Sequence, residues 1–194
     1  MNIIEKLLPV NPYSRSGRRL AACKGVILHY VGIPGQRAIN TRGYFEKTCP
    51  AEKHYSSAHY IIDLNGDIYH AVPDNEAAWH CGSSLLDPAT GKIYTDWARQ
   101  KFGYYACDPV KTSPNYCTIG IELCIDGRGN FTPETLQAAV ELTVKLLGEN
   151  RLSVEDIGHH NKVVGWKDCP LPWVKNPGLF DEFKDKVKQM RNEE

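Results

Sequence analysis

The segment AHYIIDLNGDIYHAV, residues 58–72, is the feature that most constrains how this chain can fold. Two strand-like apolar runs flank Asn65-Gly66, a dipeptide that suits the positive φ angles of a tight turn. A turn of this kind joins two antiparallel strands. Because other strand-like segments of the chain alternate with helical ones, we predict an α/β fold with a central mixed β-sheet flanked by helices.

Two further segments predict strands of that sheet. KGVILHY (24–30) is a short apolar run with His29 near its C-terminal end. TIGIELC (118–124) alternates, with Ile119, Ile121 and Leu123 on one face and Gly120, Glu122 and Cys124 on the other. An acid on a core strand is costly to bury without a purpose. Glu122 is therefore either a catalytic acid or a salt-bridged structural residue.

Helices are predicted between and after these strands. The segment 34–47 indicates a loop that turns into a helix, and Thr132 and Pro133 suit the N-cap and first position of a second helix. A last helix, 179–191, has apolar residues at helical spacing and is expected to dock on the sheet. The segment 82–117 is long and rich in Pro, Asp, Gly and Tyr, with one helical turn at DWARQKF, and such loops are usually functional or poorly ordered.

The composition limits the classes of protein to consider. With 194 residues, 42% hydrophobic and 24% charged, the chain is long enough for one core, and we predict a single domain. Its formal net charge of zero argues against a nucleic-acid partner, which requires clustered positive charge. No run approaches the roughly 20 apolar residues of a membrane span. We expect a monomer that binds neither nucleic acid nor membrane.

The N-terminus and the cysteines indicate where the protein is made. MNIIEKLLPV is interrupted by Glu5 and Lys6 and is followed by no small-residue cleavage site, so we interpret it as no secretory signal. The seven cysteines are an odd number with no Cys-x-x-Cys pair. They are therefore interpreted as reduced thiols of a protein made in the cytoplasm.

The segment GHHNKVVGWKDCP (158–170) places two adjacent histidines close to Cys169. Imidazole and thiolate together favour zinc, and three protein ligands leave a fourth position for water. His29 is the best-placed third ligand, because a rigid strand end holds a ligand better than a loop does. Taken alone, a histidine at a strand end is more often structural, and the same holds for an isolated cysteine after a histidine pair. The other histidines that could supply the third ligand are His54, His59, His70 and His80.

Several segments in one order carry a family resemblance: VILHYVG, SAHYIIDLNGDIYHAVP, AAWHCG, IGIELC and HNKVVGWKDCP. Together they resemble the zinc-dependent N-acetylmuramoyl-L-alanine amidases of the type 2, peptidoglycan-recognition-protein-like family, above all bacteriophage endolysins and prophage lytic amidases. The resemblance covers about residues 10–190. It implies that 1–194 is one catalytic domain without a recognisable wall-binding module, which cleaves the amide between N-acetylmuramic acid and L-alanine. The implied partner is bacterial peptidoglycan, reached by phage-type release.

The resemblance also implies the zinc ligands. His29 and Cys169 match two of them, and His160 matches a third because it begins a His-x-x-Val-x-Gly run. Trp166 is one extra residue before the Lys-x-Cys-Pro motif. His159 follows Gly, as the ligand does in other branches of the family, and stays an alternative to His160.

Three further roles follow from the same resemblance. Glu122 corresponds to the catalytic acid of an Ile-Gly-Ile-Glu motif, and Lys167 corresponds to a residue proposed to stabilise the oxyanion. His80 is a candidate substrate-binding residue, with a hydrogen-bonded loop histidine as the alternative. Ala58 stands where some members carry a catalytic tyrosine, which puts more weight on Glu122.

Three rival functions remain at this point. A recognition module would bind peptidoglycan without cutting it, but non-catalytic relatives lack the ligand cysteine that Cys169 provides. A thiol hydrolase would use Cys169 as nucleophile, with a pKa lowered by a helix N-terminus or a cation. A purely structural zinc site would need a fourth protein ligand, for which Cys124 and His59 are the candidates.

Overall fold

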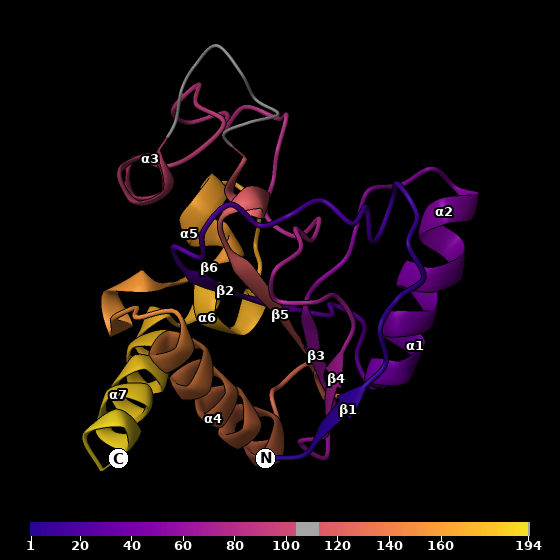
Figure 1. Ribbon diagram of the computed structural model, residues 1–194. Helices are drawn as coiled ribbons and strands as arrows, with labels where there is room; N and C mark the ends of the chain where they lie inside the picture. The colour runs from indigo at the N-terminus through magenta and orange to yellow at the C-terminus, as the bar shows by residue number, and fades with distance from the viewer. Residues whose placement is uncertain (104–112, 194) are drawn as a thin grey trace.

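The computed structural model describes residues 1–103 and 113–193, and its centre is a six-stranded sheet in the order β1-β4-β3-β5-β2-β6 (Figure 1). The β3 and β4 strands are antiparallel and the other neighbouring pairs are parallel. This confirms the predicted mixed sheet. The strands are β1 (Ile3–Glu5), β2 (Val26–Tyr30), β3 (Tyr60–Ile62), β4 (Ile68–His70), β5 (Ile119–Leu123) and β6 (Ile157–His159).

The predicted hairpin is confirmed as β3 and β4. Gly66 has a φ of +82° at the turn, a conformation that glycine adopts without steric cost. The parallel edge strands β1 and β6 were not predicted, because each has only three residues and is too short for an alternating pattern to show.

Helices cover both faces of this sheet (Figure 1). Thr132 accepts a hydrogen bond from the backbone N–H of Thr135, which confirms the predicted N-cap of α4. Residues 104–112 of the long segment, with Cys107, lie outside the described residues, and the part that contains α3 packs against α5. The helices are α1 (Ala38–Gly43), a π-helical turn (Tyr44–Thr48), α2 (Cys49–Ala51), α3 (Asp96–Phe102), a 3₁₀ turn (Pro114–Tyr116), α4 (Pro133–Glu149), a 3₁₀ turn (Val154–Asp156), α5 (His160–Val164), α6 (Leu171–Lys175) and α7 (Pro177–Glu193).

One face of the sheet forms the main apolar core with α4 and α7. Burial of these side chains is the main favourable contribution to folding. The last helix starts two residues earlier than predicted and lies against α4 and α6, while Phe180 and Phe183 extend into the core. Sheet residues in this core include Val26, Leu28, Ile119, Ile121 and Leu123.

The opposite face is covered by two separate apolar clusters. The α1 segment, residues 34–47, contains α1 and most of the π-helical turn. Its Ala38 and Phe45 pack on Ile61, whereas residues of α3 and α5 pack around Ile27. Strand alternation places His29 and Glu122 on this second face, two residues along from Ile27 and Gly120. His29 and Glu122 therefore lie on the face whose apolar cover is divided.

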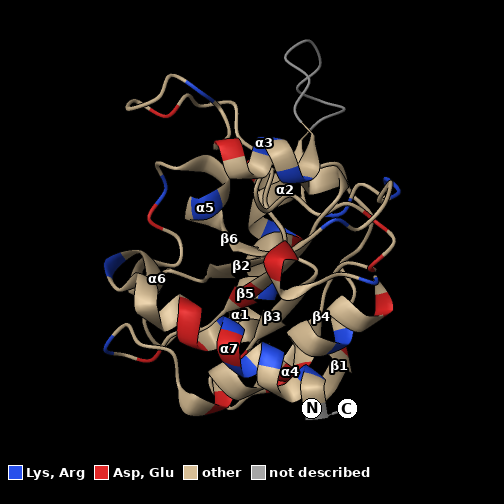
Figure 2. Ribbon diagram, turned by 90° about the vertical axis from the view of Figure 1, so that its left-hand side faces the viewer, with Lys and Arg blue, Asp and Glu red and all other residues tan. Residues whose placement is uncertain are grey.

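The outer surface carries charges of both signs. Basic and acidic residues are interspersed along α7, and α4 carries Lys145 together with three glutamates (Figure 2). Among the described helices, none combines the length and the apolar character that a membrane crossing requires. The six described cysteines are unpaired.

Candidate active site

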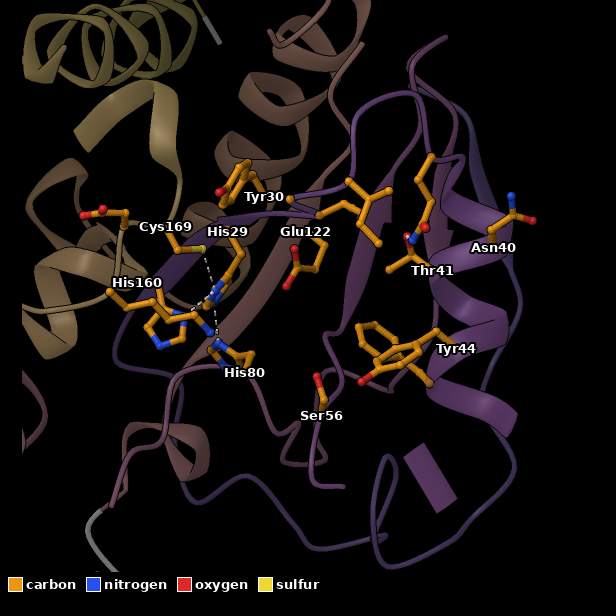
Figure 3. A pocket seen from close by; sticks show the side chains of 17 residues that line it. His29, Tyr30, Asn40, Thr41, Tyr44, Ser56, His80, Glu122, His160 and Cys169 are labelled. Carbon is orange, nitrogen blue, oxygen red and sulfur yellow. Dashed lines mark hydrogen bonds between the residues drawn. The ribbon is translucent and has the colours of Figure 1, made fainter. Parts of the chain in front are cut away.

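Side chains from the sheet and from the segment after β6 meet in one place (Figure 3). His29 of β2 pairs in register with Glu122 of β5, so the two side chains are neighbours on one face of the sheet. His160 is the first residue of α5, and Cys169 directly precedes Pro170, the N-cap of α6. Four residues selected from the sequence are thus brought together.

His29, His160 and Cys169 form a compact cluster. The Nδ1 atoms of His29 and His160 are 3.1 Å apart, and Cys169 Sγ lies 3.8 Å from His29 Nδ1. All the donor atoms lie within 4.8 Å of one another, and the residues are only 1%, 5% and 4% exposed, respectively. Three soft donors therefore converge where little water reaches them.

His159 lies next to His160 but points elsewhere. Its Nδ1 accepts a hydrogen bond of 3.2 Å from the backbone N–H of Lys162, so its ring caps α5. The ring also packs edge-on against Phe180 at 4.7 Å between centroids. The structure therefore brings His160, and not His159, to the cluster.

A chain of hydrogen bonds fixes the orientation of His29. Thr118 donates its hydroxyl proton to the carbonyl of Pro114 at 2.6 Å, so its Oγ1 and its own carbonyl oxygen are acceptors for His80 Nε2, at 3.1 and 3.3 Å. His80 Nε2 then carries the proton and Nδ1 is an acceptor. His29 Nε2 lies 3.0 Å from this Nδ1 and donates to it. The unprotonated Nδ1 of His29 consequently faces His160 and Cys169.

The two clustered imidazoles are neutral at pH 7. Burial, together with the nearby Lys167, lowers the pKa of His160 to about 3. Burial and the neighbouring His160 lower the pKa of His29 well below its usual value. Neutral imidazole is the form that binds metals.

These donors fit zinc. In a tetrahedral site with Zn–N near 2.0 Å and Zn–S near 2.3 Å, nitrogens lie about 3.3 Å from each other and about 3.5 Å from sulfur. The observed 3.1 Å between the nitrogens and 3.8 Å between Cys169 Sγ and His29 Nδ1 lie close to these separations. The Nδ1 atoms of His29 and His160 face each other, and the one on His29 carries no proton. A cation between these two nitrogens is therefore more favourable than their direct contact.

Glu122 faces the same cavity. Its Oε2 is buried and, among the described residues, has no hydrogen-bond partner. Burial raises the pKa of the Glu122 carboxyl to about 8, while Lys167 acts in the opposite direction. A carboxyl in this state can exchange protons near neutral pH. The salt-bridged alternative has no support in the described part of the chain.

The cavity around these groups measures about 520 Å³, a size typical of ligand sites. The exposed Lys167 lies in its lining, and the wall opposite the cluster comes from the α1 segment. This wall was not predicted, although the polar residues of 34–47 recur at helical spacing. The wall residues are Gln36, Asn40, Thr41 and Tyr44.

His80 and Ala58 bear on the expected roles. His80 lines the cavity but is only 8% exposed, and both its ring nitrogens have protein partners. Ala58 is fully buried beneath the α1 segment. Hydroxyl groups in the cavity lining come instead from Tyr30, Thr41, Tyr44 and Ser56.

No fourth protein donor joins the cluster within residues 1–103 and 113–193. His59 accepts a bond from the backbone N–H of Gly120 at 3.0 Å and contacts the Glu76 carbonyl at 2.9 Å, so both its nitrogens are occupied. Cys124 packs in the apolar cluster under α1. Neither alternative fourth ligand is in place.

The comparisons with known proteins agree with this arrangement. The model of the N-acetylmuramoyl-L-alanine amidase family matches residues 19–172. The chain belongs to this amidase family. A probable N-acetylmuramoyl-L-alanine amidase of Bacillus licheniformis is 33% identical over 190 residues, which are 98% of this chain and 48% of that protein. The amidase CwlL of the same organism is 32% identical over 98% of this chain and 48% of its own length.

Solved structures share the amidase fold. The catalytic domain of XlyA aligns with a TM-score of 0.70 at 23% identity, covering 96% of this chain and 99% of that domain. The PlyG catalytic domain aligns with a TM-score of 0.70 at 19% identity, covering 98% and 96% of the two chains. The chain spans about half the length of the curated amidases it matches and nearly the whole of these catalytic domains.

Proposed function

We propose that the protein is a zinc-dependent N-acetylmuramoyl-L-alanine amidase that hydrolyses the amide between N-acetylmuramic acid and L-alanine in bacterial peptidoglycan. One observation carries the proposal: a member of this family places in one cavity a His-His-Cys cluster and the Oε2 of Glu122, which has no hydrogen-bond partner in the described part of the chain.

His29, His160 and Cys169 would hold the zinc. When bound there, zinc lowers the pKa of a water ligand towards about 7 and polarises the substrate carbonyl. His80 keeps the N–H of His29 directed away from the cluster, so that Nδ1 is available as a ligand. We assign His80 this positioning role in place of direct substrate binding.

Glu122 and Lys167 would carry the proton and charge movements. Glu122 accepts a proton from the attacking water and returns it to the amino group of L-alanine as the amide bond breaks. Its raised pKa makes the return step easy. Lys167 lies in the cavity lining and stabilises the negative charge that develops on the carbonyl oxygen.

A cysteine nucleophile is less well supported. The distance of 3.8 Å between Cys169 Sγ and His29 Nδ1 would allow a Cys–His pair. However, burial, with a further contribution from the Glu122 charge, raises the pKa of the Cys169 thiol to about 12. A protonated thiol is a poor nucleophile, whereas a bound zinc ion removes the proton outright.

The setting of the reaction follows from the substrate. We propose that residues 1–194 act as the catalytic domain of a lytic enzyme that is made in the cytoplasm and released onto the cell wall, as endolysins are. Non-catalytic recognition proteins of this kind lack the ligand cysteine, so the position of Cys169 beside His29 and His160 supports cleavage over mere binding.

The experiment is digestion of purified peptidoglycan followed by mass spectrometry. The expected products are stem peptides with a free L-alanine amino group and glycan strands without peptides. Metal analysis should find one zinc per chain, and a strong chelator should abolish activity until zinc is added back. Cleavage within the stem peptide, or activity that survives complete zinc removal, would overturn the proposal.

A further inference from the structure

A second groove, outside the proposed catalytic residues, is lined by three aromatic rings, of which Tyr55 is exposed and Trp79 and Tyr116 are half-buried. Tyr55 and Trp79 have ring centroids 5.8 Å apart, and Trp79 and Tyr116 have centroids 5.9 Å apart, both in edge-to-face contact. Tyr55 is 59% exposed. A cluster of large apolar side chains that is partly exposed at the surface often marks a binding site. The remaining lining residues include Asn11, Ser16 and Arg18.

This groove adjoins the metal cavity, with two chain segments between them. Tyr55 precedes Ser56 and Trp79 precedes His80, and in each pair the first residue lines the groove and the second lines the cavity. The backbone N–H of Ser57 donates to the backbone carbonyl of Trp79 at 3.0 Å, and the backbone N–H of Trp79 donates to Ser57 Oγ at 2.9 Å. The two segments are therefore fixed side by side. A polymer whose reacting bond lies in the cavity can continue over the aromatic groove.

The groove combines aromatic surface with hydrogen-bonding groups. Arg18 donates to the Tyr116 hydroxyl at 2.6 Å, and its guanidinium lies 5.4 Å from the centre of that ring. Trp79 Nε1 donates to the Pro12 carbonyl at 3.2 Å, which holds the indole in place. A pyranose ring presents an apolar C–H face and a rim of hydroxyl and acetamido groups. Fixed aromatic surface beside a few polar groups is complementary to such a ring.

We propose that the Tyr55–Trp79–Tyr116 groove is a glycan subsite that binds N-acetylated sugars of the strand next to the muramic acid being cut. The inference rests on the proposed function, because that function supplies the polymer. It implies that the enzyme prefers intact glycan strands to single-sugar substrates.

The test compares two substrates in Tyr55→Ala, Tyr55→Phe and Leu86→Ala. Leu86 is 61% exposed and lines neither the cavity nor the groove, so it controls for loss of an exposed apolar side chain. The measured quantity is the kcat/KM on intact peptidoglycan divided by that on a muramoyl-dipeptide with one sugar. Tyr55→Ala should lower this ratio about 5- to 30-fold, as expected for one lost aromatic contact. Tyr55→Phe and Leu86→Ala should keep the wild-type ratio.

An unchanged ratio in Tyr55→Ala, or equal losses on both substrates, would overturn the subsite. Binding of peptide-free glycan strands, measured by calorimetry, separates this failure from failure of the proposed function. If the wild type cuts neither substrate, the proposed function fails, yet weaker strand binding by Tyr55→Ala still supports the subsite. Absence of strand binding by the wild type overturns it. So does a dimer in sedimentation analysis that Tyr55→Ala abolishes, because the groove would then join two copies.

Discussion

The hydrogen bond between His29 Nε2 and His80 Nδ1, 3.0 Å long, predicts that His80 controls how tightly the cluster binds zinc. His80→Leu removes the acceptor but keeps a side chain that fills space, so the N–H of His29 is left buried without a partner. His80→Asn places an amide oxygen on the γ-carbon, where Nδ1 is attached, and can accept the same bond. The two variants therefore differ mainly in the acceptor.

The size of the effect follows from the cost of an unpaired buried donor, about 1–3 kcal/mol. Because about 1.4 kcal/mol corresponds to a factor of ten, zinc should dissociate about 5- to 150-fold more readily from His80→Leu than from the wild type. This range agrees with the 10- to 100-fold effects, roughly, of removing partners of metal ligands in other proteins. His80→Asn should lie within a few-fold of the wild type.

The assay is a competition titration against a chromophoric zinc chelator, which gives the dissociation constant directly. Urea unfolding of the metal-free proteins shows whether either substitution damages the fold itself. Equal zinc affinities for the Leu and Asn variants, at matched metal-free stability, would refute the reasoning. Wild-type affinity in His80→Leu would refute it equally.

Gly120 offers an independent route to the same ring. A Cβ at position 120 would lie 2.5 Å from His80 Cγ, closer than real contacts allow, so Gly120→Ala must displace the imidazole. Zinc affinity should fall as it does in His80→Leu. Gly148→Ala in α4 is the matched control, because no described atom outside the neighbouring residues and the helix's own backbone lies within 4 Å of the added methyl group. It should leave zinc affinity unchanged and stabilise the helix by up to about 1 kcal/mol.

Three further predictions concern single groups. Glu122→Gln should lower turnover by about 10² or more, the scale of lost general-base help, with zinc content and melting temperature near wild type; a variant that keeps most of its rate would make Glu122 scaffold. His160→Ala should lose zinc and activity together, whereas His159→Ala should keep the metal, and the reverse result would assign the ligand to His159. Burial opposes the charge on His70, but pairing with two carboxylates raises its pKa. The charged His70 therefore contributes fully to the free energy of unfolding below about pH 6.5, and this contribution is lost as the pH rises through the raised pKa. Urea unfolding measured at a series of pH values across this range should show a smaller loss of stability in His70→Gln than in the wild type.

Local signals account for what the sequence predicted correctly. The hairpin depends on a turn dipeptide, the start of α4 depends on Thr132, and the faces of β5 depend on strict alternation. Each signal operates within a few residues, where the chain alone decides the geometry. His29 and Glu122 could be assigned to strands, but their pairing in register depends on contacts between β2 and β5, which lie far apart in the chain.

The parts that escaped prediction depend on distant contacts. His80 is 51 residues from His29 and 38 from Thr118, so no short motif indicates the bonds that orient its ring. The wall formed by the α1 segment is similar: its side chains line the cavity only because the helix packs over β3 and β4. The edge strands gain their partners from β2 and β4 and carry no pattern of their own.

The fate of the two adjacent histidines follows from the register of β6. His159 pairs with Leu28, whose side chain lies in the core beneath α4 and α7, so the His159 ring points to the same face and meets Phe180. The next residue must leave on the other face, where His29 lies. A slip of β6 by one residue would exchange the two rings and place the other histidine at the cluster. Which histidine joins the cluster is therefore determined by how a three-residue edge strand pairs with β2, and the apolar contact of His159 with Phe180 helps to hold that register.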